Sequence, residues 1–224
     1  MSEVEKKSAG NSGIAELRRE YGHREALHRK SLDDSPIEQF RKWFTEARSA
    51  GIVEPNAAVL STANGDGEVT SRMVLLKAYD ERGFVFFTNY GSRKAQDIAV
   101  NTHCSFLFPW VNLERQVIIC GRASRISHAE SLAYFLSRPL GSRLGAWVSD
   151  QSRVISSGAL MKKKFSEMVE KFRAGDIPLP DFWGGYRIVP HRIEFWQGGE
   201  NRLHDRFLYT RKSNDLWSIE RLQP

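Results

Sequence analysis

The spacing of hydrophobic residues changes from a helical period to a strand period near residue 57. An Asp34-Ser35-Pro36 motif is typical of a helix start, and Gly51 is expected to end that helix. Between them, hydrophobic residues recur every three or four positions, which predicts a helix with one buried face. The residues on that face are Ile37, Phe40, Trp43, Phe44 and Ala47.

From residue 57 onward, hydrophobic and polar residues alternate in short runs that are separated by turn motifs such as Asn64-Gly65-Asp66-Gly67. The runs predict strands at 57–62, 68–79, 84–88, 103–110, 115–124, 186–189, 193–197, 202–209 and 217–222. Besides the helix that ends near Gly51, helical patterns occur at 14–28, 92–100, 127–136 and 156–174, and 137–152 reads as a Gly/Ser/Arg-rich connection. Short connections favour antiparallel pairing, and no βαβ rhythm occurs. The fold class is therefore α+β, mainly antiparallel β, as a barrel or sandwich surrounded by helices.

Composition supports one globular domain. The chain has 224 residues, of which 41% are hydrophobic and 11% aromatic, enough for a substantial core. We expect residues 1–16 to be a disordered tail and residues 17–224 to form a single domain. The N-terminus lacks the apolar centre of a secretory signal, and no apolar run is long enough to span a membrane. Cys104 and Cys120 form neither a CxxC motif nor a disulfide framework, so we expect a cytoplasmic protein without a zinc site.

The net charge of +6 is spread along the chain and often neutralised by nearby acidic residues. Nucleic-acid and membrane binding normally require a dense basic tract or a basic amphipathic helix. The charge pattern therefore favours small anionic ligands as partners over nucleic acid or membranes.

The segment 194–207, EFWQGGENRLHDRF, carries the strongest sign of a binding site. It reads as a hairpin around Gly198-Gly199. If its second half is extended, Arg202, His204 and Arg206 share one face, because strand side chains alternate. With Trp196 across the turn, this row suits a flat, anionic, aromatic ligand. The alternative is a solvated strand face, and the combination of features favours a site.

Two other groups of polar residues suggest phosphate binding, and a third pair of cations stands at the ends of an apolar run. Arg93 and Lys94 stand at a helix start, where free amides and the helix dipole attract anions. Tyr134, Arg138 and Ser142 surround a helix end and offer a phenol, a guanidinium and a hydroxyl. Arg72 and Lys77 bracket an apolar run, but a regular strand would point them to opposite sides, so a bulge would be needed for both to serve one pocket. By themselves they read as charges that reach water from the strand ends. For each group the alternative is an ordinary packed or solvent-exposed role.

Several strings, in this order, make the chain resemble the pyridoxine (pyridoxamine) 5′-phosphate oxidase family from about Leu17 to Pro224. They are LRREY, SRMVLLK, FFTNYGSRKA, LERQV, YFLSRP, GAWVSDQS, FWGGYR, EFWQGGENRLHDRF and the closing ERLQP. The chain departs from the usual pattern at Leu136, where His is common, at Arg143, where Gln is common, and at Arg153, where Ser is common.

The resemblance implies an FMN-binding split β-barrel with surrounding helices, assembled as a homodimer with flavin at the subunit interface. It assigns to FMN the residues Arg72, Met73, Val74, Leu75, Leu76, Lys77, Phe87, Thr88, Arg93, Lys94, Gln116, Gln151, Ser152, Trp196 and Arg206. It assigns to the substrate Arg18, Tyr21, Lys77, Tyr134, Arg138, Ser142, Arg202 and His204, of which Arg202 and His204 are the expected catalytic residues.

The implied activity is oxidation of pyridoxine 5′-phosphate and pyridoxamine 5′-phosphate to pyridoxal 5′-phosphate. A hydride passes from C4′ to flavin N5, and O2 reoxidises the flavin with formation of H2O2. Two alternatives remain open from the sequence. One is a flavin oxidase of the same fold that acts on another ring, such as a phenazine precursor. The other is a non-enzymatic carrier of FMN or pyridoxal phosphate.

Overall fold

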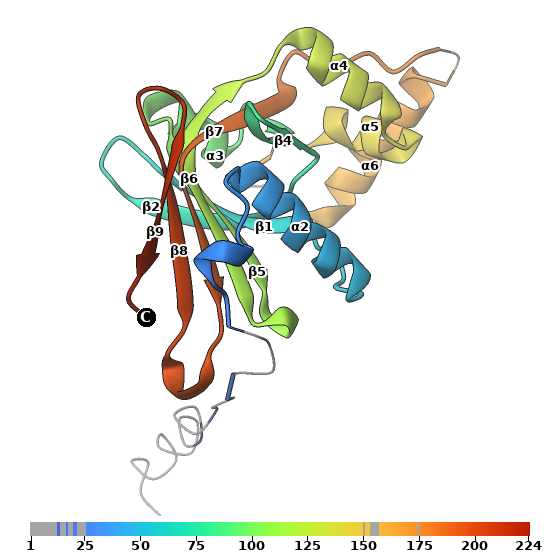
Figure 1. Ribbon diagram of the computed structural model, residues 1–224. Coiled ribbons are helices and arrows are strands. Elements are labelled where there is room, and N and C mark those ends of the chain that lie inside the picture. The colour runs from blue at the N-terminus through green and yellow to red at the C-terminus, as the bar shows by residue number, and fades with distance from the viewer. Residues whose placement is uncertain are drawn as a thin grey trace, which may run out of the picture.

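The computed structural model describes residues 13, 17, 20–21, 26–149, 151–152, 157–173 and 175–224 (Figure 1). Of the expected disordered tail it describes only Gly13, and most of the helix expected at 14–28 lies outside the described residues. A short 3₁₀ turn, η2 (Arg29–Ser31), precedes the first long helix.

Within the described residues, nine strands form one antiparallel sheet. The strands are β1 (Ala57–Ala63), β2 (Val69–Leu75), β3 (Ala78–Asp80), β4 (Gly83–Asn89), β5 (His103–Trp110), β6 (Arg115–Arg125), β7 (Trp183–Gln197), β8 (Asp205–Arg211) and β9 (Trp217–Leu222). Their order is β2-β1-β5-β6-β7-β4-β3, and β8 pairs with both β7 and β9. The first half of β7 bonds to β4 and its second half to β8, so the sheet divides at this strand. This is the antiparallel, mainly β architecture that the alternating pattern predicted.

Serine side chains cap the starts of two helices. Ser35, in the expected helix-start motif, accepts a hydrogen bond from the Glu38 amide at the start of α2 (Pro36–Ser49). Ser127 and Glu130 form a capping box at the start of α4 (His128–Ser137). The other helices are α3 (Arg93–Val100), α5 (Leu140–Val148) and α6 (Gly158–Lys171), with short 3₁₀ turns at η3 (Val111–Leu113) and η4 (Glu200–Arg202). In Figure 1, α2 lies along the sheet, and α4, α5 and α6 group together at one end.

One face of the sheet builds the main core with α2. Phe40 of α2 makes edge-to-face contacts with Phe84 and Phe108, and Trp43 packs on Phe195 in the same manner. A smaller cluster, made of Phe135, Leu144, Ala146, Ile177 and Trp183, joins α4 and α5 to the start of β7. This smaller cluster holds α4 and α5 beside the sheet.

The other face of the sheet is partly exposed and carries a mainly apolar row. Val59, Leu107 and Ile118 are register partners on β1, β5 and β6, and the row continues through Glu194 to Leu208. Their chain neighbours, such as Phe106, Phe108 and Phe195, are fully buried on the core side. We call Val59, Leu107, Ile118, Glu194 and Leu208 the outer row.

Three sequence-based expectations about the elements were wrong. The connection at 137–152 contains α5, because Leu144, Ala146 and Val148 are buried there and outweigh the weak helix propensity of its glycines. The strand expected at 68–79 is divided into β2 and β3. The strands expected at 186–189 and 193–197 are one strand, β7, which continues through Pro190 because the β6 register shifts between Cys120 and Gly121.

Candidate functional site

A cavity of about 900 Å³ lies between the sheet and the helices α3, α4 and α5. We call it the main cavity. It is lined by Arg72, Met73, Val74, Leu75, Lys77, Phe87, Thr88, Asn89, Arg93, Lys94, Tyr134, Arg138, Pro139, Ser142, Gly145, Ala146, Ser149, Gln151, Ser152 and Trp183. Residues from distant parts of the sequence meet here because β2, β4 and the start of β7 supply the sheet side.

Arg72, Arg93 and Lys94 form one group of cations in the main cavity. Lys94 is only 7% exposed, and its ammonium donates to Thr88 Oγ1 at 3.2 Å and Gln151 Oε1 at 3.0 Å. Burial, together with the nearby Arg72 charge, lowers the pKa of Lys94 to about 8. Both of these hydrogen-bond acceptors are neutral, so a bound anion would favour the charged form of Lys94.

Arg93 makes one polar contact through its side chain and one through its backbone. Its guanidinium forms an ion pair with Glu68 at 2.7 Å, and its backbone amide donates to Ser152 Oγ at 3.3 Å. Ser92 is the N-cap of α3, but its side chain makes no capping bond. The first turn of α3 therefore faces the main cavity with two cations and without a capping oxygen from Ser92.

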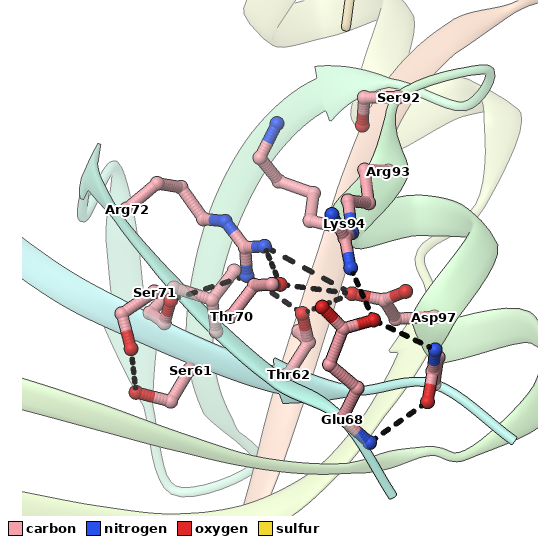
Figure 2. A network of polar contacts seen from close by, with 12 residues as sticks. Ser61, Thr62, Glu68, Thr70, Ser71, Arg72, Ser92, Arg93, Lys94 and Asp97 are labelled. Atoms are coloured by element: carbon pink, nitrogen blue, oxygen red, sulfur yellow. Dashed lines mark hydrogen bonds and ion pairs between the residues drawn. The ribbon is translucent and has the colours of Figure 1, made fainter. Parts of the chain in front are cut away.

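A polar network of β1, β2 and α3 residues holds the Arg72 guanidinium (Figure 2). The guanidinium donates to Thr62 Oγ1 at 2.6 Å, to Thr70 Oγ1 and to the Leu60 carbonyl at 3.3 Å. Asp97 Oδ2 lies 3.9 Å from the same guanidinium and accepts from both threonine hydroxyls. Burial lowers the pKa of Arg72, and the neighbouring Asp97 charge opposes that shift.

Tyr134, Arg138 and Ser142 form a second polar group in the main cavity. The Tyr134 ring stacks on Phe87 with 3.9 Å between centroids and 22° between planes. The Arg138 guanidinium lies 4.7 Å from the centre of the Trp183 ring. Arg138 Nη1 is buried and has no hydrogen-bond partner among the described residues. Burial also lowers the pKa of Arg138, so a bound anion would satisfy both the orphaned donor and the charge.

These donors suit a flavin phosphate at one group and a second phosphate at the other. A buried lysine beside two arginines and an unpartnered buried guanidinium nitrogen are unfavourable unless anions bind. The apolar stretch of β2, Met73 to Leu75, together with Phe87, supplies the flat surface that an aromatic ring system needs. The residues present therefore fit FMN and a phosphorylated ligand.

Gln116, Trp196 and Arg206 lie outside the lining of the main cavity. They are register partners on β6, β7 and β8, and all three are half exposed on the face that carries the outer row. Arg206 forms an ion pair with Glu194 at 2.8 Å. His204 packs on Trp196 with 4.6 Å between ring centroids, and Tyr21 contacts both rings edge-on. The expected residues thus fall into two separate clusters within one chain. The first lines the main cavity, and the second cluster consists of Gln116, Trp196, His204 and Arg206.

The expected single row of Arg202, His204 and Arg206 was wrong. Strand β8 begins at Asp205, and Arg202 ends the 3₁₀ turn η4 with a φ of 63°. A Cβ on Gly199 would lie 2.3 Å from the Leu203 carbonyl oxygen, so the chain folds tightly back at this point. This compact loop, not a regular strand, sets the directions of Arg202 and His204.

His204 has a defined hydrogen-bonding state. Its Nδ1 accepts from the Gly199 amide at 3.2 Å, so the neutral ring carries its proton on Nε2. Burial and the charges of Arg202 and Arg206 lower the pKa of His204. The ring is therefore mainly neutral near pH 7, with an Nε2 proton available for donation.

The main cavity thus brings together most of the expected ligand residues, including Arg72 and Lys77, which a regular strand would have separated. Both reach it because β2 ends at Leu75, before Lys77. Leu76 is buried and does not line the cavity, and Arg18 lies outside the described residues. Sequence reasoning missed Trp183 and Asn89, although Trp183 opens the FWGGYR string. It also missed Asp97, Thr62 and Thr70, for which no sequence signal existed.

No three His, Cys, Asp or Glu side chains in the described part of the chain are placed to hold a metal ion. None of the helices in the same residues is both long and apolar enough to cross a membrane.

Comparison with known proteins is consistent along the chain. Residues 44–172 match the family model described as pyridoxamine 5′-phosphate oxidase, and residues 183–224 match the pyridoxine 5′-phosphate oxidase C-terminal dimerisation region. The pyridoxine/pyridoxamine 5′-phosphate oxidase of Prochlorococcus marinus is 58% identical over 215 residues, covering 94% of this chain and 96% of the relative. The protein of the same name from Crocosphaera subtropica is 57% identical and covers 94% and 99%.

Solved structures support the fold assignment. PhzG from Burkholderia lata, in complex with tetrahydrophenazine-1-carboxylic acid, superposes with a TM-score of 0.84 at 29% identity, covering 91% of this chain and 100% of that one. A pyridoxamine 5′-phosphate oxidase-related, FMN-binding protein from Nostoc punctiforme superposes with a TM-score of 0.69 at 16% identity, covering 86% and 100%. The split-barrel fold predicted from the resemblance is confirmed, and the chain belongs to the pyridoxine/pyridoxamine 5′-phosphate oxidase family.

Proposed function

We propose that this protein is an FMN-dependent oxidase that converts pyridoxine 5′-phosphate and pyridoxamine 5′-phosphate to pyridoxal 5′-phosphate. The observation that carries the proposal is the pair of cationic groups in the main cavity, which suits one phosphate on the flavin and one on the substrate. Relatives with at least half of their residues identical carry the corresponding name along nearly the whole chain.

The chain's own residues would hold and orient both ligands. Arg72, Arg93 and Lys94 would bind the flavin phosphate, and Tyr134, Arg138 and Ser142 the substrate phosphate. Two fixed anchors position the substrate ring over the flavin and lower the entropic part of the barrier. When bound, FMN would supply the two-electron acceptor for oxidation at C4′.

We further propose that the protein is a homodimer whose subunits complete each other's sites. Four of the five residues of the outer row are apolar and partly exposed, and the row lies directly beside Gln116, Trp196 and Arg206. A two-fold interface uses the same surface on both subunits, so it would cover both outer rows at once. The same packing would bring the second cluster of one subunit toward the main cavity of the other, uniting residues that one chain keeps apart.

Arg202 and His204 would then face the reacting side of the substrate. The Arg202 guanidinium would cover the pyridine ring or bind its phenolate oxygen, because this group both stacks and donates. The Nε2 proton of His204 would orient the oxygen or nitrogen on C4′. We place the protein in the cytoplasm, where its two free cysteines would stay reduced.

Absorbance spectroscopy tests the proposal. The purified protein should show a flavin spectrum that bleaches under anaerobic conditions when pyridoxine 5′-phosphate is added. Colour should return when O2 is admitted, together with H2O2 and pyridoxal 5′-phosphate. A protein that binds FMN but never bleaches with either phosphorylated substrate would be a carrier, and the proposal would be wrong.

The PhzG neighbour calls for one further comparison, because that structure holds a tricyclic ligand without a phosphate group. The second polar group, in which Arg138 Nη1 has no hydrogen-bond partner, favours a phosphorylated substrate for this chain. Turnover of a dihydrophenazine carboxylate without turnover of pyridoxine 5′-phosphate would reverse the assignment.

A further inference from the structure

Asp97 is a buried carboxylate that joins three elements next to the main cavity. It is 5% exposed and lies on α3, one turn after Arg93 and Lys94. Its Oδ2 accepts from Thr62 of β1 at 2.6 Å and from Thr70 of β2 at 3.3 Å. Asp97 therefore ties the helix that carries two of the cations to the strand that carries the third.

The hydrogen bonds around Asp97 have a fixed direction. A carboxylate only accepts and a guanidinium only donates, whereas a hydroxyl does both. Each threonine gives its single proton to Asp97, so its oxygen is left to accept from Arg72. Figure 2 shows the resulting relay, from Arg72 through the two hydroxyls to Asp97.

We propose that Asp97 is a positioning residue that fixes the Arg72 guanidinium, through Thr62 and Thr70, for recognition of the flavin phosphate. This inference rests on the proposed function, in which Arg72 belongs to the phosphate-binding group. Asp97 does not line the main cavity, so it would not touch a phosphate bound there, and its negative charge alone would repel one. Its contribution is to fix the Arg72 side chain before the ligand binds. A flexible Arg72 would lose conformational entropy on binding, and a fixed one has already lost it.

Binding of FMN and riboflavin to the flavin-free dimer separates positioning from other roles, because the two ligands differ only in the phosphate. Dissociation constants come from quenching of flavin fluorescence. Asp97→Ala removes the acceptor, and we expect about a tenfold loss of FMN affinity, the size of one charge-assisted hydrogen bond. Riboflavin affinity should stay within about a factor of two, since it lacks the group that Arg72 recognises.

The conservative variant provides the rescue. Both threonine bonds go to one oxygen, so Asp97→Asn keeps an acceptor in place, and FMN affinity should stay close to that of the wild type. Thr70→Val removes one oxygen that accepts from Arg72 and should reproduce part of the loss, even if Asp97→Ala folds poorly. Ser71→Ala is the matched control, because Ser71 is the next residue in β2 and bonds to Ser61 instead, at 2.8 Å.

The outcomes distinguish the explanations. Tighter FMN binding in both Asp97 variants would mean that Asp97 acts only as a repelling charge, and equal losses for both flavins would mean a purely structural role. Either result overturns the inference, as does unchanged FMN affinity in both Asp97→Ala and Thr70→Val. A wild-type protein that binds neither flavin would overturn the proposed function itself, and the inference with it.

Discussion

The Arg138 guanidinium lies over the Trp183 indole, with 4.7 Å between the guanidinium carbon and the ring centre. Trp183 also stacks on Phe87 at 5.3 Å, and Phe87 stacks in turn on Tyr134. One indole therefore supports two side chains of the second polar group. It does so while it remains buried in the cluster that joins α4, α5 and β7.

Replacing Trp183 with Leu should weaken binding of the phosphorylated substrate. Loss of a desolvated cation–π contact costs about 1–2 kcal/mol, which predicts a rise in KM for pyridoxine 5′-phosphate of roughly five- to thirtyfold. Trp183→Phe keeps an aromatic face and should raise KM far less. Steady-state kinetics with FMN saturating, beside melting curves of both variants, provide the measurement. Equal KM values in the two variants would contradict the role of the ring.

The buried Lys94 predicts a pH dependence of flavin binding. Its pKa of about 8 lies below the usual lysine value of 10.5, and a bound phosphate would raise it again. Above pH 8 the free protein has lost the proton that the complex holds, so FMN affinity should fall, approaching about tenfold per pH unit. The flavin phosphate is already a dianion there, since its second pKa is about 6.

Titrations of flavin-free protein between pH 7 and 10 check this expectation. Riboflavin serves as the ligand control, because without a phosphate its affinity should not follow the ionisation of Lys94. Lys94→Arg serves as the protein control, since arginine stays charged throughout this range. A fall of the same steepness in Lys94→Arg would assign the effect to another group.

Ile118 lies at the centre of the outer row and tests the proposed dimer. A carboxylate there would be buried without a partner at the interface, so Ile118→Asp should be monomeric by light scattering. Ile118 is half exposed in the single chain, so the fold should persist by circular dichroism. FMN should be lost from the variant, because each site would lack the cluster supplied by the partner. Val53→Asp, at a residue that is 89% exposed outside the row, should remain a dimer that binds FMN.

Arg202 is exposed and lies outside the main cavity of its own chain, so its proposed role requires the partner subunit. Arg202→Leu should slow anaerobic flavin reduction by pyridoxine 5′-phosphate about ten- to a hundredfold, which corresponds to roughly 1.4–2.7 kcal/mol of barrier. FMN binding should be unchanged. Stopped-flow absorbance follows the reduction, and Arg48→Leu on the exposed side of α2 is the matched control. Wild-type reduction rates in Arg202→Leu would remove this residue from the site.

The strands were the most predictable part of the fold. A sheet with one buried face imposes a period of two on the sequence, and β5 and β9 match their predicted limits at both ends. The α5 helix was not predictable in the same way. Its two glycines and its serine are poor helix formers, and only the burial of residues such as Leu144 against other elements shows why it forms.

The candidate site was predictable where a ligand residue stands in a recognisable string, and not where a residue acts through another. Asp97 and Thr62 read as ordinary members of a helix and a strand, since their contacts join positions that are 35 residues apart. Arg202 was placed in a strand because alternation was extended through a Gly-Gly turn whose geometry interrupts it. Local patterns cannot carry such information, which arises only when distant segments meet.

The alternation along β6, β7 and β8 has a consequence for how the sequence can change over time. Gln116, Trp196 and Arg206 occupy positions directly beside Val117, Phe195 and Phe207, whose side chains fill the core. A single inserted or deleted residue within these strands would exchange the two faces, placing charges in the interior and phenylalanines on the surface. We therefore expect length variation among natural relatives to be confined to turns such as residues 212–216.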